Sequence, residues 1–273
     1  MSLAVDNSER VDEIIAARTR GRINRSILYG LVLLAVLWSL KTTVVDDTDW
    51  ERMGSVWEVL ASVGEFLKVD WGLLPQLWQP ALETILVATL GPLLGVITCI
   101  PAIWFGALNI SPFPPITYPI ARLMMTLSRS IHEIVWALFF VAAVGLGALA
   151  GVLAIAVRSI GFIAKMSAEA IEDLDPRPVE AIRAVGGSEF QVFLYAILPQ
   201  VLPAMISVII FEWEINIRRS SVLGLVGAGG LGLVFFRQLN TFNHGGVTAV
   251  IIAILVLILF GEIISYFTRR ALI

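Results

Sequence analysis

Six apolar runs, each about 20 residues or longer, constrain this chain more than any other feature of its sequence. They cover residues 26–45, 82–108, 118–144, 148–168, 201–223 and 247–267. A helix needs about 20 mostly apolar residues to cross a bilayer, and in lipid it must satisfy its own backbone hydrogen bonds. The sequence therefore predicts an all-α, polytopic membrane protein with six transmembrane helices. Gly91, Pro92, Gly95 and Pro101 predict kinks, not breaks, in the second run.

The composition excludes several other classes of protein. Hydrophobic residues make up 58% of the chain and charged residues 15%, whereas soluble domains carry roughly 25% charged residues. This balance excludes a disordered chain and argues against a water-soluble enzyme. The formal net charge of -3 provides no basic field for nucleic acid. The single Cys99 excludes an internal disulfide and a cysteine-rich metal site.

Residues 1–25 are predicted to form a cytoplasmic tail ahead of the first membrane helix. The apolar run of residues 26–45 is longer than a signal-peptide core of about 7–15 residues, and no small-residue cleavage pattern follows it. We therefore interpret the run as a retained membrane helix. Residues 11–23 fit an amphipathic helix on the membrane surface, and a frayed tail is the alternative.

Basic residues in the loops orient the predicted spans. The tail carries five arginines, whereas residues 46–80 carry two basic residues against seven acids. Because Lys and Arg mark cytoplasmic loops, the tail is predicted inside and residues 46–80 outside. Six crossings then return Arg269 and Arg270 to the cytoplasm and place the loop of residues 169–200 there. Both termini are therefore predicted to lie in the cytoplasm.

The predicted outer loop has a helical pattern of apolar residues. Trp50, Met53, Trp57 and Leu60 recur at helical spacing, with acidic residues between them. This pattern is typical of a helix lying at the membrane interface. It indicates either a docking surface for an extracytoplasmic partner or a loop held at the lipid headgroups.

The loop of residues 169–200 contains a short, bounded helix. Pro176 and Pro178 favour a helix start, and Gly186 and Gly187 favour its end, which predicts a helix near residues 178–185. Such a helix is too short to be stable alone, so a neighbour should hold it.

This loop resembles the cytoplasmic loop of permeases in binding-protein-dependent ABC importers. The family pattern is Glu-Ala-Ala, three residues, Gly, nine residues, Ile, one residue, Leu-Pro. Ile182 and Ala196 depart from the pattern by apolar exchanges. The matching positions are Glu180, Ala181, Gly186, Leu198 and Pro199.

The resemblance implies a type I ABC importer permease fold, a location in the inner membrane of a bacterium and a set of partners. In the family this loop docks on an ATPase, so Glu180, Ala181, Gly186 and Gly187 are expected near that contact. With one such loop and no internal duplication, the chain is expected to pair with a second copy and two ATP-binding subunits. ATP and Mg would belong to those subunits, and an extracytoplasmic binding protein would deliver the cargo. The permease itself would catalyse no reaction.

Three further stretches resemble the phosphonate-type permeases within this family. They are residues 129–151, 169–181 and 212–232, and the likeness covers roughly residues 80–270. It implies import of a phosphonate-type oxyanion by alternating access. Phosphite, hypophosphite or phosphate as cargo is an alternative, and so is a polytopic membrane enzyme acting on lipid-linked phosphate.

Polar and ionisable residues inside the spans are candidate site residues, because each charge costs about 2.5–3.5 kcal/mol on insertion scales. Glu214 and Arg218 are one helical turn apart and can pair. Glu212, Asn216 and Arg219 stand at i, i+4 and i+7, so they are predicted to line a second stripe of the same helix. The group either lines the oxyanion path, with Arg129, Arg218 and Arg219 as the leading candidates, or locks helices together. The role of His132 is open. The set is Arg122, Arg129, His132, Glu133, Glu212, Glu214, Asn216, Arg218 and Arg219.

Gly227, Gly229 and Gly232 form a Gly-x-Gly-x-x-Gly string. A dinucleotide site would need a preceding strand, whereas a membrane helix is predicted here. These glycines permit tight turns, so they are candidates for an outer gate. His132 and His244 stand on different segments and support no metal site, and the chain has no phosphate loop for ATP.

Overall fold

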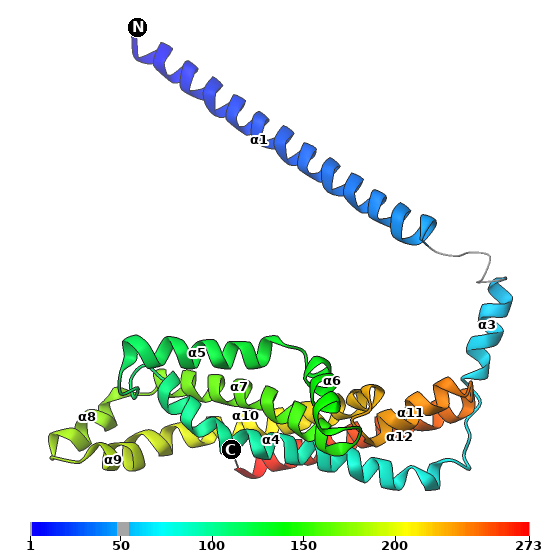
Figure 1. Cartoon of the computed structure of the whole chain (residues 1–273). Helices are drawn as coiled ribbons and strands as arrows, with labels where there is room; N and C mark the ends of the chain where they lie inside the picture. The colour runs from blue at the N-terminus through cyan, green and yellow to red at the C-terminus, as the bar shows by residue number, and fades with distance from the viewer. Residues whose placement is uncertain (1, 48–54, 273) are drawn as a thin grey trace. The chain divides into compact units, whose positions relative to one another are not determined.

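The computed structural model describes residues 2–47 and 55–272, and the regular elements within them are all helical. The chain divides into two units, Met1–Val63 and Gly64–Ile273 (Figure 1). The predicted all-α membrane fold is confirmed. Five helical segments are long and apolar enough to cross a membrane: Gly21–Asp46, Trp78–Gly106, Ala148–Glu172, Glu189–Val226 and His244–Ala271.

The first unit is dominated by one long helix. Helix α1 runs from Ser2 to Leu40 and continues into a π-helical turn, η1, at Lys41–Asp46. No break in the helix separates the predicted tail from the predicted first span. The apolar side chains of the span, such as Leu31 and Leu34, are exposed, which suits a lipid environment.

Part of the predicted interfacial helix lies in the described residues. Helix α3 covers Val56–Glu65, whereas Trp50 and Met53 lie outside the described residues. Trp57 on this helix is exposed, as are Trp71 and Trp78 further along the chain.

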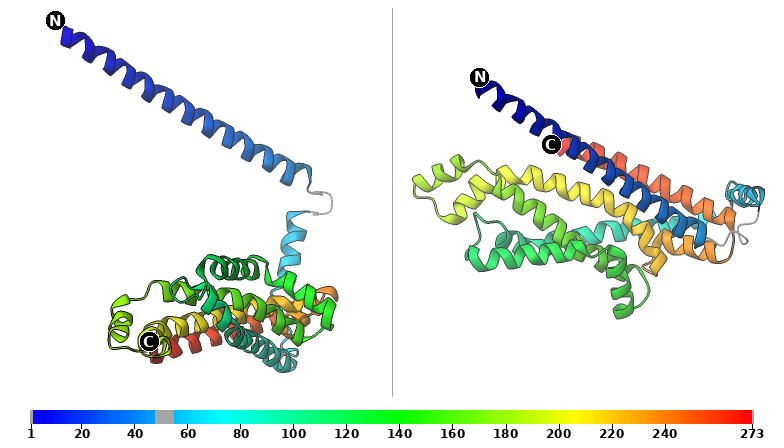
Figure 2. Two further views of the ribbon diagram at one scale, coloured as in Figure 1. Left: turned by 60° about the vertical axis from the view of Figure 1, so that its left-hand side comes forward. Right: turned by 90° about the horizontal axis from the view of Figure 1, so that it is seen from above.

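The second unit is a helical bundle with α7 at its centre. Helix α7 packs against α4, α5, α6 and α10, while α8 and α9 lie at one end of the bundle (Figure 2). The elements of this unit are η2 Leu74–Gln76, α4 Trp78–Gly106, α5 Pro114–Ser130, α6 Glu133–Val144, α7 Ala148–Glu172, α8 Pro176–Ala184, α9 Glu189–Val192, η3 Phe193–Ile197, α10 Leu198–Leu223, η4 Gly224–Val226, α11 Gly230–Asn240 and α12 His244–Leu272.

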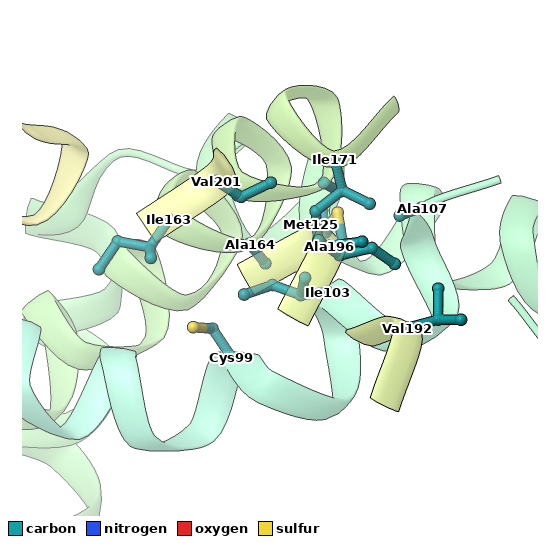
Figure 3. Close-up of a cluster of buried hydrophobic side chains, with 12 residues drawn as sticks. Cys99, Ile103, Ala107, Met125, Ile163, Ala164, Ile171, Val192, Ala196 and Val201 are labelled. Atoms are coloured by element: carbon teal, nitrogen blue, oxygen red, sulfur yellow. The ribbon is translucent and has the colours of Figure 1, made fainter. Parts of the chain in front are cut away.

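Small residues set the close packing of α4 on α7. A Cβ atom at Gly91 would lie 2.5 Å from the Ile155 side chain, and one at Gly95 would lie 2.9 Å from Ser159. Small residues at such crossings let membrane helices approach closely. Helix α4 also passes Pro92 without a break. Further along, buried side chains including Met125, Ile163 and Val201 join α5, α7 and α10 in an apolar core (Figure 3).

The predicted span over residues 118–144 is present as two helices with a sharp bend between them. Helices α5 and α6 meet at 87°, so the pair counts as a span only if it is taken as a broken one. The backbone is extended at Ile131 and His132, and the Ile134 N–H donates to His132 Nδ1 at 3.3 Å. His132 therefore caps α6, which explains why one helix ends and another begins here.

Candidate functional site

The predicted cytoplasmic helix is present as α8, two residues earlier than expected. Asp175 caps its start by accepting a hydrogen bond from the Arg177 backbone N–H at 3.0 Å. The Arg177 guanidinium also bonds this carboxylate and lowers the pKa of Asp175. Gly186 follows the helix with φ +82°, a left-handed conformation that suits glycine after a helix end.

Helix α8 presents an exposed surface but is held from beneath. Glu180 and Ala181 are exposed, and no residue of α8 is buried. Val179 and Ile182 pack against the apolar core. Gln200 Oε1 accepts from the Asp175 N–H at 3.2 Å, which ties the loop to α10. The helix is therefore positioned by the bundle while its outer face stays free in this chain.

Five side chains of α6, α7 and α10 form what we call the buried network: Glu133, Arg158, Glu212, Asn216 and Arg219. Its centre is Glu212, which is fully buried. Glu212 Oε1 accepts from Ser159 Oγ at 2.9 Å, Asn216 Nδ2 at 3.2 Å and Arg219 Nη1 at 3.3 Å. Glu212, Asn216 and Arg219 thus share one stripe, as predicted from their spacing.

Glu133 links this network to the bend between α5 and α6. Its carboxylate lies 3.0 Å from Arg158 Nε and 3.5 Å from Arg219 Nε. Arg158 Nε and Nη1 and Glu212 Oε2 are buried without a hydrogen-bond partner, so the Arg158–Glu133 contact is a charge contact that is not aligned as a hydrogen bond. The two cations, Arg158 and Arg219, and the two anions, Glu133 and Glu212, thus neutralise one another. Some of their buried nitrogen and oxygen atoms make no hydrogen bond.

The opposite side of α10 carries a second set, the α10–α12 charge group: Glu214, Arg218, Glu262 and Arg269. Glu214 Oε2 accepts from Arg269 Nη2 at 2.5 Å, and its Oε1 lies 3.4 Å from Arg218 Nη2. Arg218 also pairs with Glu262. The group borders a cavity of about 660 Å³ that is also lined by Ser207, Phe211, Ser265, Tyr266 and Arg270.

The remaining predicted path residues are not brought together. Arg122 of α5 bonds Glu172 Oε2 at 2.6 Å and the Gly106 carbonyl at 2.9 Å, so it joins the C-terminal ends of α4 and α7. Arg129 is exposed, and within the described part of the chain its side chain has no ion pair. Arg129, Arg218 and Arg219 share no common partner there. His132 acts as a helix cap.

The glycine string follows α10 in a compact turn. Gly227 has φ +88° and Gly229 has φ +81°, conformations that glycine adopts at little cost. Gly232 is buried so closely that a Cβ there would lie 2.1 Å from the Ser221 carbonyl oxygen. The segment before the string is helical, so the structure has none of the strand–turn–helix context of a dinucleotide site.

Two residues of α4 fix the turn to the bundle. The Gly230 N–H donates to Glu83 Oε2 at 3.0 Å, and the Leu231 N–H donates to Thr84 Oγ1 at 2.9 Å. These acceptors satisfy the first N–H groups of α11, a helix that the sequence reasoning did not predict. Any movement of the turn would have to break or carry these contacts.

Sequence reasoning missed several polar residues of these groups. Arg158 and Glu262 each stand inside an apolar run, so the rule that ionisable residues in spans are functional candidates would have found both. Ser159 and Glu83 carry no comparable signal, because serine is common in membrane helices and Glu83 lies at the edge of its run. Among the described residues, no group of three His, Cys, Asp or Glu side chains is placed to hold a metal.

The matched segment of the family comparison includes both helix α8, which ends before Gly186, and the centre of the bundle. Residues 85–272 match the family described as "Binding-protein-dependent transport system inner membrane component". The chain belongs to this family. It is therefore an inner-membrane transport component, and the alternative of a polytopic enzyme has no support from the match.

Relatives within the family carry phosphorus-related names. The phosphite transport system permease protein PtxC of Stutzerimonas stutzeri is 34% identical over 90% of this chain and 87% of its own length. The phosphate-import permease protein PhnE of Mycolicibacterium smegmatis is 38% identical over 72% of this chain, which spans only 37% of that relative. The putative cryptic phosphonate permease PhnE2 of Escherichia coli is 35% identical over 43% of this chain and 97% of its own length.

Solved structures agree on the fold. The permease in an inward-facing MetNI methionine ABC transporter superposes with a TM-score of 0.66, at 20% identity, over 75% of this chain and all of that chain. An alginate importer chain gives a TM-score of 0.51 at 16% identity, over 91% of this chain and 98% of its own. At such identities the likeness concerns the fold alone, and it confirms the predicted type I importer permease architecture.

Proposed function

We propose that this chain is the transmembrane subunit of an ATP-driven importer that carries an oxyanion of phosphorus. The names of its relatives support the cargo class, since they refer to phosphonate, phosphite and phosphate. Phosphonate is the leading cargo, with phosphite, hypophosphite and phosphate as alternatives. The chain itself performs no covalent step.

The single observation that carries the proposal is the exposed helix α8. Its Glu180 and Ala181 face outward, and Gly186 and Gly187 follow it at the spacing of the family loop. We propose that this surface docks on an ATP-binding subunit that supplies ATP and Mg. Because the chain has one such helix, two copies would engage two ATPases and one binding protein. Both termini would then lie in the cytoplasm.

The cargo path is proposed to run beside the bend of α5 and α6, along the buried network. Guanidinium groups offer a rigid fork of donors that suits phosphorus oxyanions. Arg158 and Arg219 supply two such groups, while Glu133 and Glu212 offset their charge. Balanced charge favours passage, because an anion held too tightly would not leave. The turn at Gly227, Gly229 and Gly232 is proposed as the outer gate.

Reconstitution tests this proposal directly. The chain, its ATPase and its binding protein are placed in liposomes, and ATP hydrolysis and uptake are measured with phosphonate, phosphite, hypophosphite, phosphate and, as the control, sulfate. We expect stimulation by a phosphorus oxyanion and none by sulfate. Activity without any ATPase subunit, or equal stimulation by all anions, would contradict the proposal.

A further inference from the structure

The C-terminal end of α7 carries two acidic side chains that its own helix does not favour. Glu169 and Glu172 stand in the last turn of α7, and no basic residue accompanies them in that turn. The C-terminus of a helix carries partial negative charge, so carboxylates at this end are unfavourable unless a cation from elsewhere approaches them. A contact with another element must therefore account for these two carboxylates.

The cation is supplied by Arg122 of α5, whose side chain is largely buried at 18% exposed. Its Nη2 donates to Glu172 Oε2 at 2.6 Å, and its Nη1 donates to Glu169 Oε1 at 3.3 Å. Its Nε donates to the carbonyl oxygen of Gly106, the last residue of α4, at 2.9 Å. Glu169 also lies 3.6 Å from Lys165, whereas Glu172 pairs with no cation besides Arg122 within the described residues.

Two further hydrogen bonds fasten the segment after α4 to the same end of α7. The Leu108 N–H donates to Glu172 Oε1 at 2.9 Å, and Asn109 Nδ2 donates to the Ile171 carbonyl oxygen at 2.7 Å. Glu172 therefore uses one carboxylate oxygen on α5 and the other on the segment after α4. We call the four residues Arg122, Glu172, Leu108 and Asn109 the α7 junction.

Helix α8 begins close to the α7 junction. Only residues 173–175 separate the end of α7 from Pro176, the first residue of α8. Three residues span at most about 10 Å even when fully extended, so they leave little slack between two helices. A displacement of α8 is therefore expected to pull on the last turn of α7, where Glu172 lies.

We propose that Arg122 is a positioning residue that passes movement of α8 through Glu172 to α4 and α5. The inference rests on the proposed function, because it assumes that an ATPase docks on α8, and it adds the side-chain pair that carries the movement onward. Helix α4 has 29 residues, a length of roughly 44 Å, and near its other end Glu83 and Thr84 hold the glycine turn. One continuous helix thus links the α7 junction with the proposed outer gate, and packed helices of this kind carry energetic coupling between distant sites.

The ratio of uptake to ATP hydrolysis tests the role of Arg122. The chain, its ATPase and its binding protein are reconstituted in liposomes with Arg122→Leu, Arg122→Lys or Glu172→Gln, and uptake of methylphosphonate, phosphite and phosphate per ATP hydrolysed is measured. This ratio does not depend on how much of the complex is folded, so a merely structural role leaves it unchanged. The matched control is Thr126→Val, which removes an exposed hydroxyl of α5 that donates to the Arg122 carbonyl oxygen of its own helix.

Coupling between sites typically corresponds to factors of about 5–150, so we expect Arg122→Leu and Glu172→Gln to lower uptake per ATP at least about fivefold. Arg122→Lys keeps a cation opposite Glu172 and should retain most of the ratio, and Thr126→Val should retain all of it. A fall of uptake and ATP hydrolysis in equal proportion would overturn the proposal, and so would the same loss in Thr126→Val. If Arg122→Leu does not fold, Glu172→Gln gives the same comparison while keeping an acceptor for the Leu108 N–H.

A label on α4 distinguishes failure of this inference from failure of the proposed function. A nitroxide is attached to Leu86→Cys, an exposed position in the first half of α4, in a Cys99→Ala background, and its EPR spectrum is recorded with and without ATP. We expect an ATP-dependent change that Arg122→Leu abolishes.

This label response without uptake of any phosphorus oxyanion supports the α7 junction and rejects the proposed cargo. Uptake by the wild type together with a label response that Arg122→Leu leaves intact rejects the inference and leaves the proposed function standing. A wild-type label that does not respond to ATP would also overturn the inference, because movement would then not reach α4.

Discussion

The two charge groups on α10 differ in burial although they come from one short stretch of helix. Glu212 and Arg219 point into the bundle, where Glu212 is fully buried and contacts α7. Glu214 and Arg218 point towards α12, and Arg218 remains 45% exposed. Charged residues that are one or two positions apart on α10 thus lie in different environments. The loss of an ion pair is therefore expected to cost a different amount of free energy on each side of the helix.

The difference shows what a charge in a span can mean. An ion pair that is buried on all sides holds helices of one chain together, and removing one partner leaves an unpaired charge in the interior. A half-exposed pair at the same depth is incomplete, because its remaining surface needs protein or water. The buried network is therefore expected to govern the stability of the chain. The α10–α12 charge group is expected to govern the association of the chain with a neighbouring protein segment.

The largest expected effect comes from Arg219→Leu. This change leaves Glu133 with Arg158 alone and removes the cationic partner of Glu212. Removing one partner of a buried pair costs about 3–5 kcal/mol. Thermal unfolding of the purified chain in detergent should show this loss, whereas Arg129→Leu at an exposed position should change little.

The same variants separate a structural role from a transport role. If Arg219→Leu unfolds like the wild type but no longer transports, Arg219 contacts the cargo rather than stabilising the bundle. If it keeps both stability and full transport, neither role is right. Either result would contradict the expectation that the buried side of α10 governs the stability of the chain.

A second, smaller effect is expected at the glycine turn. Gly229→Ala places a side chain at φ +81°, where left-handed backbone costs an L-residue about 1–2 kcal/mol, and its Cβ would lie 2.6 Å from Glu83 Oε1. The matched control is Gly145→Ala at φ +90°, where a Cβ meets nothing within 4 Å. Uptake should fall more for Gly229→Ala. Equal uptake by the two variants would argue against a gate at this turn.

A third prediction concerns the half-exposed pair. Arg218→Leu should destabilise the isolated chain less than Arg219→Leu does, because Arg218 is half-exposed and Glu214 keeps Arg269 as a partner. It should nevertheless weaken association of two copies, measured by the yield of co-purification of two differently tagged copies of the chain. Arg218→Leu combined with Glu262→Leu should recover part of that yield, because no unpaired charge remains. A large loss of stability with unchanged association would contradict these roles, because the α10–α12 charge group would then stabilise the single chain.

The smallest effect is expected at the Asp175–Arg177 pair at the start of α8, where Arg177 is exposed and Asp175 partly so. The hydrogen bond from Arg177 lowers the pKa of Asp175 in the folded chain, so the pair stabilises α8 at pH values above the ordinary pKa of aspartate, about 3.9. This contribution is lost as the pH falls through the lowered pKa. Asp175→Asn should therefore be slightly less stable than the wild type at pH 7, and the difference should shrink as the pH falls below the ordinary pKa and vanish only below the lowered pKa of Asp175. A difference that persists at low pH would show that the charge is not its source.

Much of this architecture follows from the sequence because bilayer thickness and hydrogen bonding leave few choices. The second, fourth, fifth and sixth apolar runs correspond to α4, α7, α10 and α12. The stripe of Glu212, Asn216 and Arg219 follows from helical spacing alone. The bend before Glu133 does not, because residues 118–144 have the length and apolar character of one span, and only the capping by His132 separates the two helices.

The contacts between distant segments could not be predicted in the same way. Arg158 and Glu262 carry a local signal, but their partners Glu133 and Arg218 lie on other helices. Which charges meet depends on how α7 and α12 are rotated about their axes, and small residues such as Gly95 set that through close packing. Periodicity gives the face of a helix but not the identity of its neighbour.

The bend between α5 and α6 also determines on which side of the membrane the later segments of the chain lie. Helix α4 and helix α7 flank this junction, and α8 follows α7. If the bent pair turned back without traversing the bilayer, α8, with Arg177 and Arg183 on it, would emerge on the same face as residues 55–77. If residues 55–77 lie outside and α8 docks on an ATPase inside, as proposed, the chain needs an odd number of passages between α4 and α7, and the bent pair would supply that passage.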